Sequence, residues 1–458
     1  MAYLPNTDRD RHEMLAAVGL EAESELFREI PGHLRDPQID LPDPLSEFEL
    51  GHEMRRLADA NRPLSKWDCF LGAGIYSRFV PAIVRATIGR PEFYTAYTPY
   101  QAEASQGYLQ TIFEFQSLVA ELYDLDVANA SMYDGATATA EGALLAVAHT
   151  GRERILASAS LHPEILAVLT TYASGRGAEL DVIPTRDGLT DTEAAERLLA
   201  TGSPPAVVIA PQPNFWGLIE PVGELVELAH GQGALALVVA DPLAATVLQP
   251  PGALGADLAA GDGQQLGIPA QLGGPTVGLL ACRQELVRRI PGRLVGMTKD
   301  SSGGRAYCLT LQTREQHIRR ERATSNICTN HALMALAATA YMAKMGEAGM
   351  RAVADISYRR AHELARRLSA IPGFSLEHGE APFLWEFALS CPGDAALWAE
   401  RLATRGILAG LPLGRFDPQR SNQLLVCATE TSSPAAIDRY EQAVRELVQA
   451  PAPAGAPA

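Results

Sequence analysis

Residues 127–149 read VANASMYDGATATAEGALLAVAH and contain three successive patterns. The run Val127–Met132 has the length and apolar content of a short buried strand. A turn of small residues, Gly135-Ala136-Thr137, follows it and opens the helix Ala138–His149. Backbone N–H groups at the start of a helix attract phosphate, so the turn is a candidate anion site. Taken alone, this turn also fits an ordinary tight connection between a strand and a helix.

Short apolar runs separated by helical patterns continue around this stretch over residues 61–330. The pattern is typical of a mainly parallel sheet covered by crossover helices, so it predicts a large α/β domain. Tyr108–Tyr123 is a well-marked helix of this region. The other predicted strands are Arg154–Ala157, Leu180–Pro184, Ala206–Ala210, Ala234–Ala240 and Thr276–Ala281.

Helical patterns also precede this domain, over residues 1–60. Thr7, Ser24 and Ser46 are suited to cap successive helices of this N-terminal arm. An arm of this length must pack on something. It either wraps over the surface of its own chain or contacts a second subunit.

A smaller α+β domain is predicted over residues 331–450. It begins with the helix His331–Met345. Its last helix is capped by Ser433, with Pro434 in the first turn. Residues 451–458 contain only Pro, Ala and Gly and are expected to form a disordered tail. The strands predicted in this domain are Phe383–Leu389 and Leu424–Ala428.

Composition narrows the class of function. The chain has 458 residues and a formal net charge of −16, without a basic block that could neutralise a run of phosphates, so nucleic-acid binding is not expected. No apolar stretch is suited to span a membrane and the N-terminus is polar, so we expect a soluble, cytoplasmic protein. The six cysteines show no metal-ligand spacing, which favours reduced thiols and no metal site.

Three polar residues, His162, Asn214 and Asp241, stand at or just beyond predicted strand ends. The carboxyl ends of parallel strands are where ligands bind. With the Gly135–Thr137 turn they match a pyridoxal phosphate pocket, which needs amides for the phosphate, a flat ring, a donor to the phenolic oxygen and a carboxylate at the ring nitrogen. Taken singly, His162 also fits a helix start, Asn214 a turn, and Asp241 a cap before Pro242.

Such a pocket also needs a lysine for the Schiff base. The chain has only three, Lys66, Lys299 and Lys344, and the segment where the lysine is expected has Gln264 instead. Glutamine cannot form the aldimine, so the sequence predicts a cofactor-like architecture without its covalent anchor. A self-sufficient enzyme that uses Lys299 is a less favoured alternative, because Lys299 lies well beyond the expected segment.

Two further segments carry unusual residues. Phe93–Gln101 contains three tyrosines without helical or strand periodicity, and it either packs under a loop or presents phenol groups to a substrate. The block Thr313–Thr329 is rich in charge and ends in hydroxyl and amide groups. It is either a solvated, salt-bridged helix or a set of donors to an anion.

Taken together, these features resemble one family, the P-protein of the glycine cleavage system, glycine dehydrogenase (decarboxylating). Within it the chain is similar to the first, or alpha, subunit of the two-chain form. The blocks that carry the resemblance are Phe70–Tyr76, Tyr94–Gln101 with Glu103 and Gln106-Gly107, Met132–Thr137, Gly263-Gln264 to Gly274-Pro275, and Thr313–Thr329.

The resemblance implies a pyridoxal-phosphate-dependent transferase fold of type I and a division of labour between two chains. The beta subunit is expected to hold pyridoxal phosphate covalently, in an α2β2 assembly. Glycine loses CO2, and its aminomethyl group passes to the lipoyl arm of the H-protein. A non-catalytic scaffold that only stabilises the beta subunit is the second interpretation.

The resemblance also assigns residues to a composite site between the chains. Arg314 and His317 either orient the block that contains them or serve ordinary interface packing. Arg322 replaces a lysine frequent in the family. The expected site residues are Tyr94, Tyr97, Tyr100 and Gln101 along the site, and Thr324, Ser325 and Asn326 near the partner's cofactor phosphate. Gly135, Ala136, Thr137, His162, Asn214 and Asp241 then form a relic pocket without cofactor.

Overall fold

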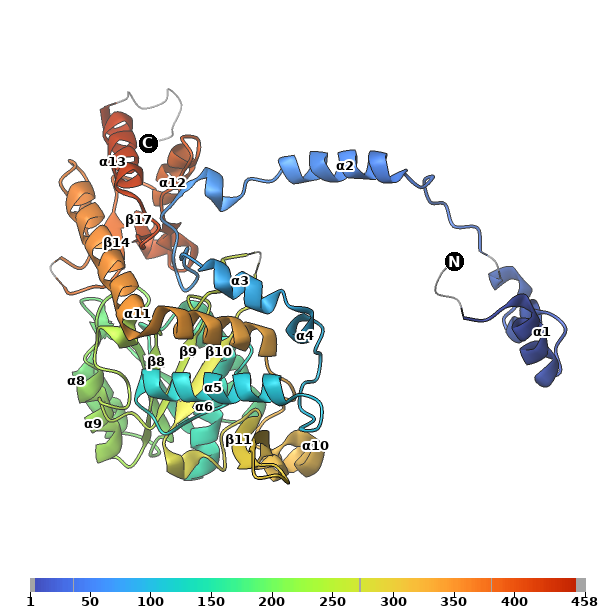
Figure 1. Cartoon of the computed structure of the whole chain (residues 1–458). Coiled ribbons are helices and arrows are strands. Elements are labelled where there is room, and N and C mark those ends of the chain that lie inside the picture. The colour runs from blue at the N-terminus through green and yellow to red at the C-terminus, as the bar shows by residue number, and fades with distance from the viewer. Residues whose placement is uncertain (1–4, 36, 272, 380, 450–458) are drawn as a thin grey trace. The chain divides into compact units, whose positions relative to one another are not determined.

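The computed structural model describes residues 5–449 except 36, 272 and 380, so the predicted tail lies outside the described residues. The chain divides into two compact units, residues 1–63 and 64–458. Each unit is described by itself, and Figure 1 labels their elements.

The first unit contains α-helices and short 3-10 helices. Thr7 and Ser46 each cap a helix, and both caps are closed by the acidic residue three positions on. The prediction for Ser24 is wrong: it lies inside a short 3-10 helix that follows Ala22. The elements of this unit are α1 (Asp8–Ala17), 3-10 helices Glu23–Phe27 and Gly32–Leu34, and α2 (Glu47–Asp59).

The second unit is built on a seven-stranded sheet of order β2-β10-β9-β8-β7-β3-β4. Five of the strands are parallel, and β10 runs antiparallel to β9 and β2. The α/β prediction is confirmed, but β9 was missed because its sequence, LAAGD, is short and poor in branched residues. The strands are β2 (Val127–Ala128), β3 (Arg154–Ser158), β4 (Glu179–Ile183), β7 (Val207–Gln212), β8 (Leu235–Ala240), β9 (Leu258–Asp262) and β10 (Gly278–Cys282).

Helices cover both faces of this sheet, because successive side chains of a buried strand point to opposite faces. In β7, Val207 and Ile209 enter the core beneath α6 and α7, whereas Val208 and Ala210 enter the core on the side of α5, α9 and α11. Figure 1 shows α5 and α11 running side by side over the sheet. The helices are α5 (Gln106–Tyr123), α6 (Gly135–Thr150), α7 (Pro163–Arg176), α8 (Thr192–Leu199), α9 (Val222–Gly231) and α11 (Ala332–Ser369).

A β-hairpin and three short helices belong to the second unit outside its seven-stranded sheet. The hairpin joins β11 (Leu294–Lys299) and β12 (Arg305–Thr310) and packs against α5. Two of these helices are α3 (Ala82–Ile88) and α4 (Pro91–Tyr94), and the third, α10 (Gln316–Arg319), follows the hairpin.

The C-terminal region packs a four-stranded antiparallel sheet under helices. Its first helix, α11, is interrupted at Gly346, whose φ of 59° lies in the left-handed region. Ser433 caps the last helix, as predicted, by accepting the Ala436 N–H at 3.2 Å. The sheet has the order β13-β14-β17-β16, formed by β13 (Ser375–Leu376), β14 (Glu386–Ser390), β17 (Gln423–Cys427) and β16 (Leu411–Pro412), with α12 (Ala395–Ala403) and α13 (Pro434–Gln449).

Candidate functional site

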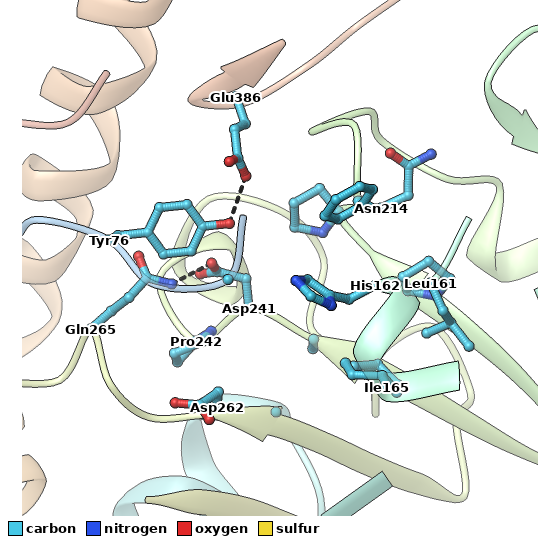
Figure 2. Close-up of a pocket in the computed structure, with 17 residues that line it drawn as sticks. Tyr76, Leu161, His162, Ile165, Asn214, Asp241, Pro242, Asp262, Gln265 and Glu386 are labelled. Atoms are coloured by element: carbon cyan, nitrogen blue, oxygen red, sulfur yellow. Dashed lines mark hydrogen bonds between the residues drawn. The ribbon is translucent and has the colours of Figure 1, made fainter. Parts of the chain in front are cut away.

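A small cavity lies at the carboxyl ends of β7, β8 and β9, at the edge where a parallel sheet places its ligands (Figure 2). Its volume is about 120 Å³. His162, Asn214 and Asp241 all line it, so the structure brings these three predicted residues together. The turn residues Gly135, Ala136 and Thr137 do not line the cavity.

Asp241, at the end of β8, is held by three donors. Its Oδ1 accepts the N–H groups of Leu243 at 2.8 Å and Ala244 at 3.0 Å, and its Oδ2 accepts the Gln265 side-chain amide. Burial raises the pKa of Asp241, while the nearby Arg78 guanidinium lowers it. The carboxylate is thus engaged within the chain at both oxygens.

His162 caps α7 through its ring. The Nδ1 atom accepts the Glu164 N–H at 3.1 Å, so the ring proton resides on Nε2, which donates to the Ala73 carbonyl at 3.0 Å. The ring packs edge-on against Phe215, with centroids 4.8 Å apart. Burial lowers the pKa of His162, which favours this neutral form.

Asn214 organises its own loop. Its Oδ1 accepts the N–H groups of Trp216 and Leu218 at 3.0 and 3.1 Å. Its Nδ2 donates to the Gly188 carbonyl at 2.8 Å and to Glu220 at 2.7 Å. Every polar atom of this side chain is therefore used inside the chain.

Carboxylates already occupy the start of α6, where the sequence suggested a phosphate. The Gly135 N–H donates to Asp262 at 3.0 Å, and the Thr137 N–H donates to Asp134 at 2.7 Å. Asp262 also accepts the Gln264 N–H at 2.9 Å and the Thr276 hydroxyl. Negative charge at a helix start is favourable, and here the chain supplies it itself.

Two glutamines stand where the Schiff-base lysine was expected. Gln264 is buried and bonded to the backbone of Tyr76 and Ile268, and it does not line the cavity. Gln265 does line it and links Arg78, at 2.9 Å, to Asp241. No lysine lines the cavity, and Lys299 lies on β11 beside a different hollow under α5.

A buried pair that sequence reasoning missed closes the cavity from the side of β14. The Tyr76 hydroxyl donates to Glu386 at 2.7 Å (Figure 2). The Ala73 N–H donates to the same carboxyl at 2.5 Å. Burial raises the pKa of Glu386 to about 7. Tyr76 belongs to a block that carries the family resemblance, which was the available signal.

Pyridoxal phosphate does not fit this pocket. The amides that would bind its phosphate donate to Asp262 and Asp134, and a glutamine stands in place of the lysine. Small-molecule pockets usually enclose about 300–1,000 Å³, and this one is smaller. The residues thus keep the plan of a cofactor pocket but fill it with their own side chains.

The residues expected at a composite site lie away from this cavity. Tyr94 and Tyr97 are exposed, Tyr97 to 90%, and Gln101 is exposed as well. Tyr100 is half-buried and donates its hydroxyl to Asn330 at 2.8 Å. None of the four lines the pocket around Asp241.

The Thr324–Asn326 segment is anchored to α6 and α7. Arg176 donates to the Thr324 carbonyl at 3.2 Å, and Ser325 lies near Glu141 of α6. Burial raises the pKa of Glu141 to about 7. Sequence reasoning missed Glu141 and Arg176, because each lies inside a helical pattern that gave no separate signal. Asn326 is exposed.

The charged block that precedes this segment is only partly a solvated helix. Arg314 donates to the Ile290 carbonyl and is half-buried, whereas Arg322 is exposed. His317 lies 3.5 Å from the buried Glu315 carboxylate. Within the described residues there is no group of three potential metal ligands, and no helix among them is long and apolar enough to cross a membrane.

The fold defines the class: it is that of pyridoxal-phosphate-dependent transferases of fold type I. A solved C-DES mutant with glycine covalently linked to its pyridoxal phosphate superposes with a TM-score of 0.60 over 84% of this chain and 97% of its own, at 16% identity, which shows the fold alone. The model of the glycine cleavage system P-protein family matches residues 1–442, and the chain belongs to this family.

Relatives cover almost the whole chain. It is 49% identical over 449 residues to the probable glycine dehydrogenase (decarboxylating) subunit 1 of Moorella thermoacetica, over 98% of this chain and 100% of that one. A crystal structure of glycine decarboxylase (P-protein) in inhibitor-bound form matches with a TM-score of 0.89 and 46% identity, over 98% and 100% of the two chains. The family resemblance and the fold type inferred from the sequence are confirmed.

Proposed function

We propose that this chain is the first of two different subunits of a glycine dehydrogenase (decarboxylating), and that it is active only in an α2β2 assembly with a lysine-bearing beta subunit. Pyridoxal phosphate is then held covalently by the beta subunit. The same proposal places the complex in the cytoplasm, where free cysteines such as the six of this chain stay reduced.

One observation carries the proposal: the chain's own pocket is filled by its own side chains. Asp262 takes the helix start, Gln265 bridges Arg78 and Asp241, and no lysine is within the lining. A chain of this fold that cannot anchor the cofactor needs a partner that does. The name subunit 1 of its relatives likewise presupposes a second subunit.

The overall reaction is that of the family. Glycine loses its carboxylate as CO2, and the aminomethyl group passes to one sulfur of the lipoyl disulfide of H-protein, which is reduced. When bound, pyridoxal phosphate supplies the electron sink for this decarboxylation. The present chain contributes binding and orientation, because its own pocket offers no place for the chemistry.

The side chains that this subunit contributes are those that lie free on its surface. Tyr94, Tyr97 and Gln101 are exposed and available to line a site completed by the partner, with Tyr100 behind them. Asn326 is exposed at the end of the charged block and can reach the partner's cofactor phosphate. Thr324 and Ser325 stand beside it, and Ser325 lies near Glu141.

Borohydride reduction followed by peptide mapping tests the proposal. The chain and its beta subunit are mixed with pyridoxal phosphate, separately and together, then reduced and digested. We expect label on a beta-subunit lysine only, and glycine decarboxylation only after mixing. Label on Lys299 of the isolated chain would overturn the proposal and favour a self-sufficient enzyme.

A non-catalytic scaffold is the second candidate, and the closed pocket is the observation that favours it. In that case the surface tyrosines would serve assembly alone. Alanine at Tyr97 or Asn326 then leaves the turnover of an intact complex unchanged, whereas the composite site requires a loss of turnover without loss of assembly.

A further inference from the structure

A partly buried arginine that neither the pocket nor the family motifs explain lies between the tyrosine segment and the charged block. Arg293 precedes β11, and its side chain is 12% exposed. Its guanidinium carbon lies 4.0 Å from the centroid of the Tyr100 ring. The same group reaches the Glu315 carboxylate at 3.3 Å and donates through Nε to the Cys328 carbonyl at 3.0 Å.

These contacts need the planar shape of a guanidinium. One face covers the aromatic ring, while two different edges reach a carboxylate and a backbone carbonyl. A lysine ammonium carries the same charge but has no flat face or fixed fork, so it cannot make the three contacts together. The arrangement is therefore specific to arginine rather than to a positive charge.

Tyr100 is fixed at its other end as well. Its hydroxyl donates to Asn330 Oδ1 at 2.8 Å, and Asn330 Nδ2 donates to the Ala130 carbonyl at 2.9 Å. The ring is therefore held on its face by Arg293 and at its tip by Asn330. Three residues earlier, Tyr97 projects outward with 90% exposure.

Glu315 provides the counter-charge under this arrangement. Its side chain is 6% exposed, one oxygen faces Arg293 at 3.3 Å, and the same oxygen lies 3.5 Å from His317 Nδ1. Its other oxygen, Oε1, has no hydrogen-bond partner within the described residues. A buried carboxylate with a single close guanidinium depends on that guanidinium to remain in place.

We propose that Arg293 is a positioning residue of the composite site, which holds Tyr100 and the chain at Cys328 in one fixed arrangement. The inference rests on the proposed function, since it assumes that Tyr100 lines the site completed by the beta subunit. Arg293 acts through Tyr100 and touches no substrate. Its loss therefore misplaces both segments together, and a misplacement of about 1 Å can cost a hundredfold in rate.

A double-mutant cycle in the assembled complex tests this inference. The variants are R293K, R293Q, Y100L and the combinations of each arginine change with Y100L, with R401K as the matched control because Arg401 also lies over an aromatic ring, that of Trp398, at 5.4 Å. Glycine decarboxylation, KM for glycine, assembly by gel filtration and the thermal midpoint are measured for each.

We expect R293K and R293Q to lower kcat/KM for glycine by roughly tenfold or more while the complex still assembles. Adding either to Y100L should cost less than it does in the wild-type background, since the part of the loss that passes through Tyr100 is already incurred while the Cys328 and Glu315 contacts are still lost. R401K should keep wild-type turnover. If R293Q fails to assemble, R293K and its combination with Y100L decide the question.

Three results would overturn the inference. Wild-type kinetics of R293K would show that only the charge matters, and independent losses in the double variant would show that Arg293 does not act through Tyr100. Full activity of Y100L would show that Tyr100 is not part of the site. That result would overturn this inference but not the proposed function. A wild-type complex that does not decarboxylate glycine would overturn the proposed function and this inference with it.

Discussion

The backbone N–H of Gly135 donates to the carboxylate of Asp262 at 3.0 Å, across the start of α6 and the end of β9. This contact places an internal anion where a cofactor phosphate would bind in this fold. A β-carbon at Gly135 would come within 2.9 Å of the Asp262 N–H, so the helix start and the strand end are packed too closely for a larger residue. The Asp262 carboxylate is consequently packed against the first turn of α6 and bonded to it.

Removing this carboxylate should reopen the anion site. In Asp262→Ala the Gly135 N–H loses its acceptor and the local negative charge falls, so we expect inorganic phosphate to bind at least about tenfold more tightly than to the wild type. Isothermal titration of the chain with phosphate measures the change.

Asp300→Ala serves as the control for this prediction, because Asp300 is an exposed acid that bonds only within its own hairpin turn. It should bind phosphate no better than the wild type. Equal affinity of Asp262→Ala and the wild type would mean that the carboxylate does not block the helix start.

The fold could be predicted because its signals are local. Branched apolar runs marked β3, β7 and β8, and hydroxyl caps marked α1 and α2. The strand β9 and the pairing order could not be predicted. Leu258–Asp262 contains no β-branched residue, and the order depends on contacts between distant segments.

Two features of the site could be predicted: the polar residues at the strand ends, and the absence of a lysine from the segment where it is expected. Asp241 and His162 meet at one cavity because parallel strands end at one edge. That Asp262 fills the helix start, or that Arg293 joins Tyr100 to Glu315, depends on side-chain packing between segments far apart in sequence. No spacing rule in a single sequence encodes such pairings.

Glu141 makes the stability of the chain depend on pH. Its pKa is raised from 4.5 to about 7 by burial, so between these values the folded chain holds a proton that the unfolded chain releases. Stability contributed by this group is therefore lost as the pH rises from 4.5 to about 7. The loss is on the order of 3 kcal/mol.

Glu141→Gln should remove that part of the dependence, because the amide stays neutral over the whole range. The free energy of unfolding of the variant, minus that of the wild type, should therefore increase from pH 5 to pH 8. Urea unfolding at both pH values measures this difference. Glu386, whose pKa is also about 7, continues to lower stability over the same range in both proteins. An identical pH slope for the two proteins would contradict the prediction.

Arg78 is expected to stabilise the chain strongly through its buried ion pair. Its side chain is 1% exposed, pairs with Glu430 at 2.8 Å and donates to Gln265 at 2.9 Å. Arg78→Met leaves the Glu430 carboxylate buried without its counter-charge, which typically costs about 3–5 kcal/mol. Urea unfolding measures the loss.

An exposed ion pair provides the contrast for Arg78. Arg439 is 57% exposed and contacts Asp68 at 2.7 Å. Arg439→Met should change the free energy of unfolding by less than about 1 kcal/mol, because water screens the pair. Similar losses for the two variants would show that burial of Arg78 does not set its contribution.

Tyr97→Ala separates catalysis from folding most cleanly. With 90% of its surface exposed, Tyr97 has almost no packing to lose, so the thermal midpoint of the isolated chain should stay within about 1 °C of the wild type. In the assembled complex the same change should lower glycine decarboxylation by roughly tenfold if, as we propose, the phenol lines the composite site. Tyr358→Ala is the matched control, because Tyr358 is another exposed tyrosine, on α11, and should keep full turnover. Full turnover of Tyr97→Ala in an intact complex would exclude this tyrosine from the site and favour the scaffold.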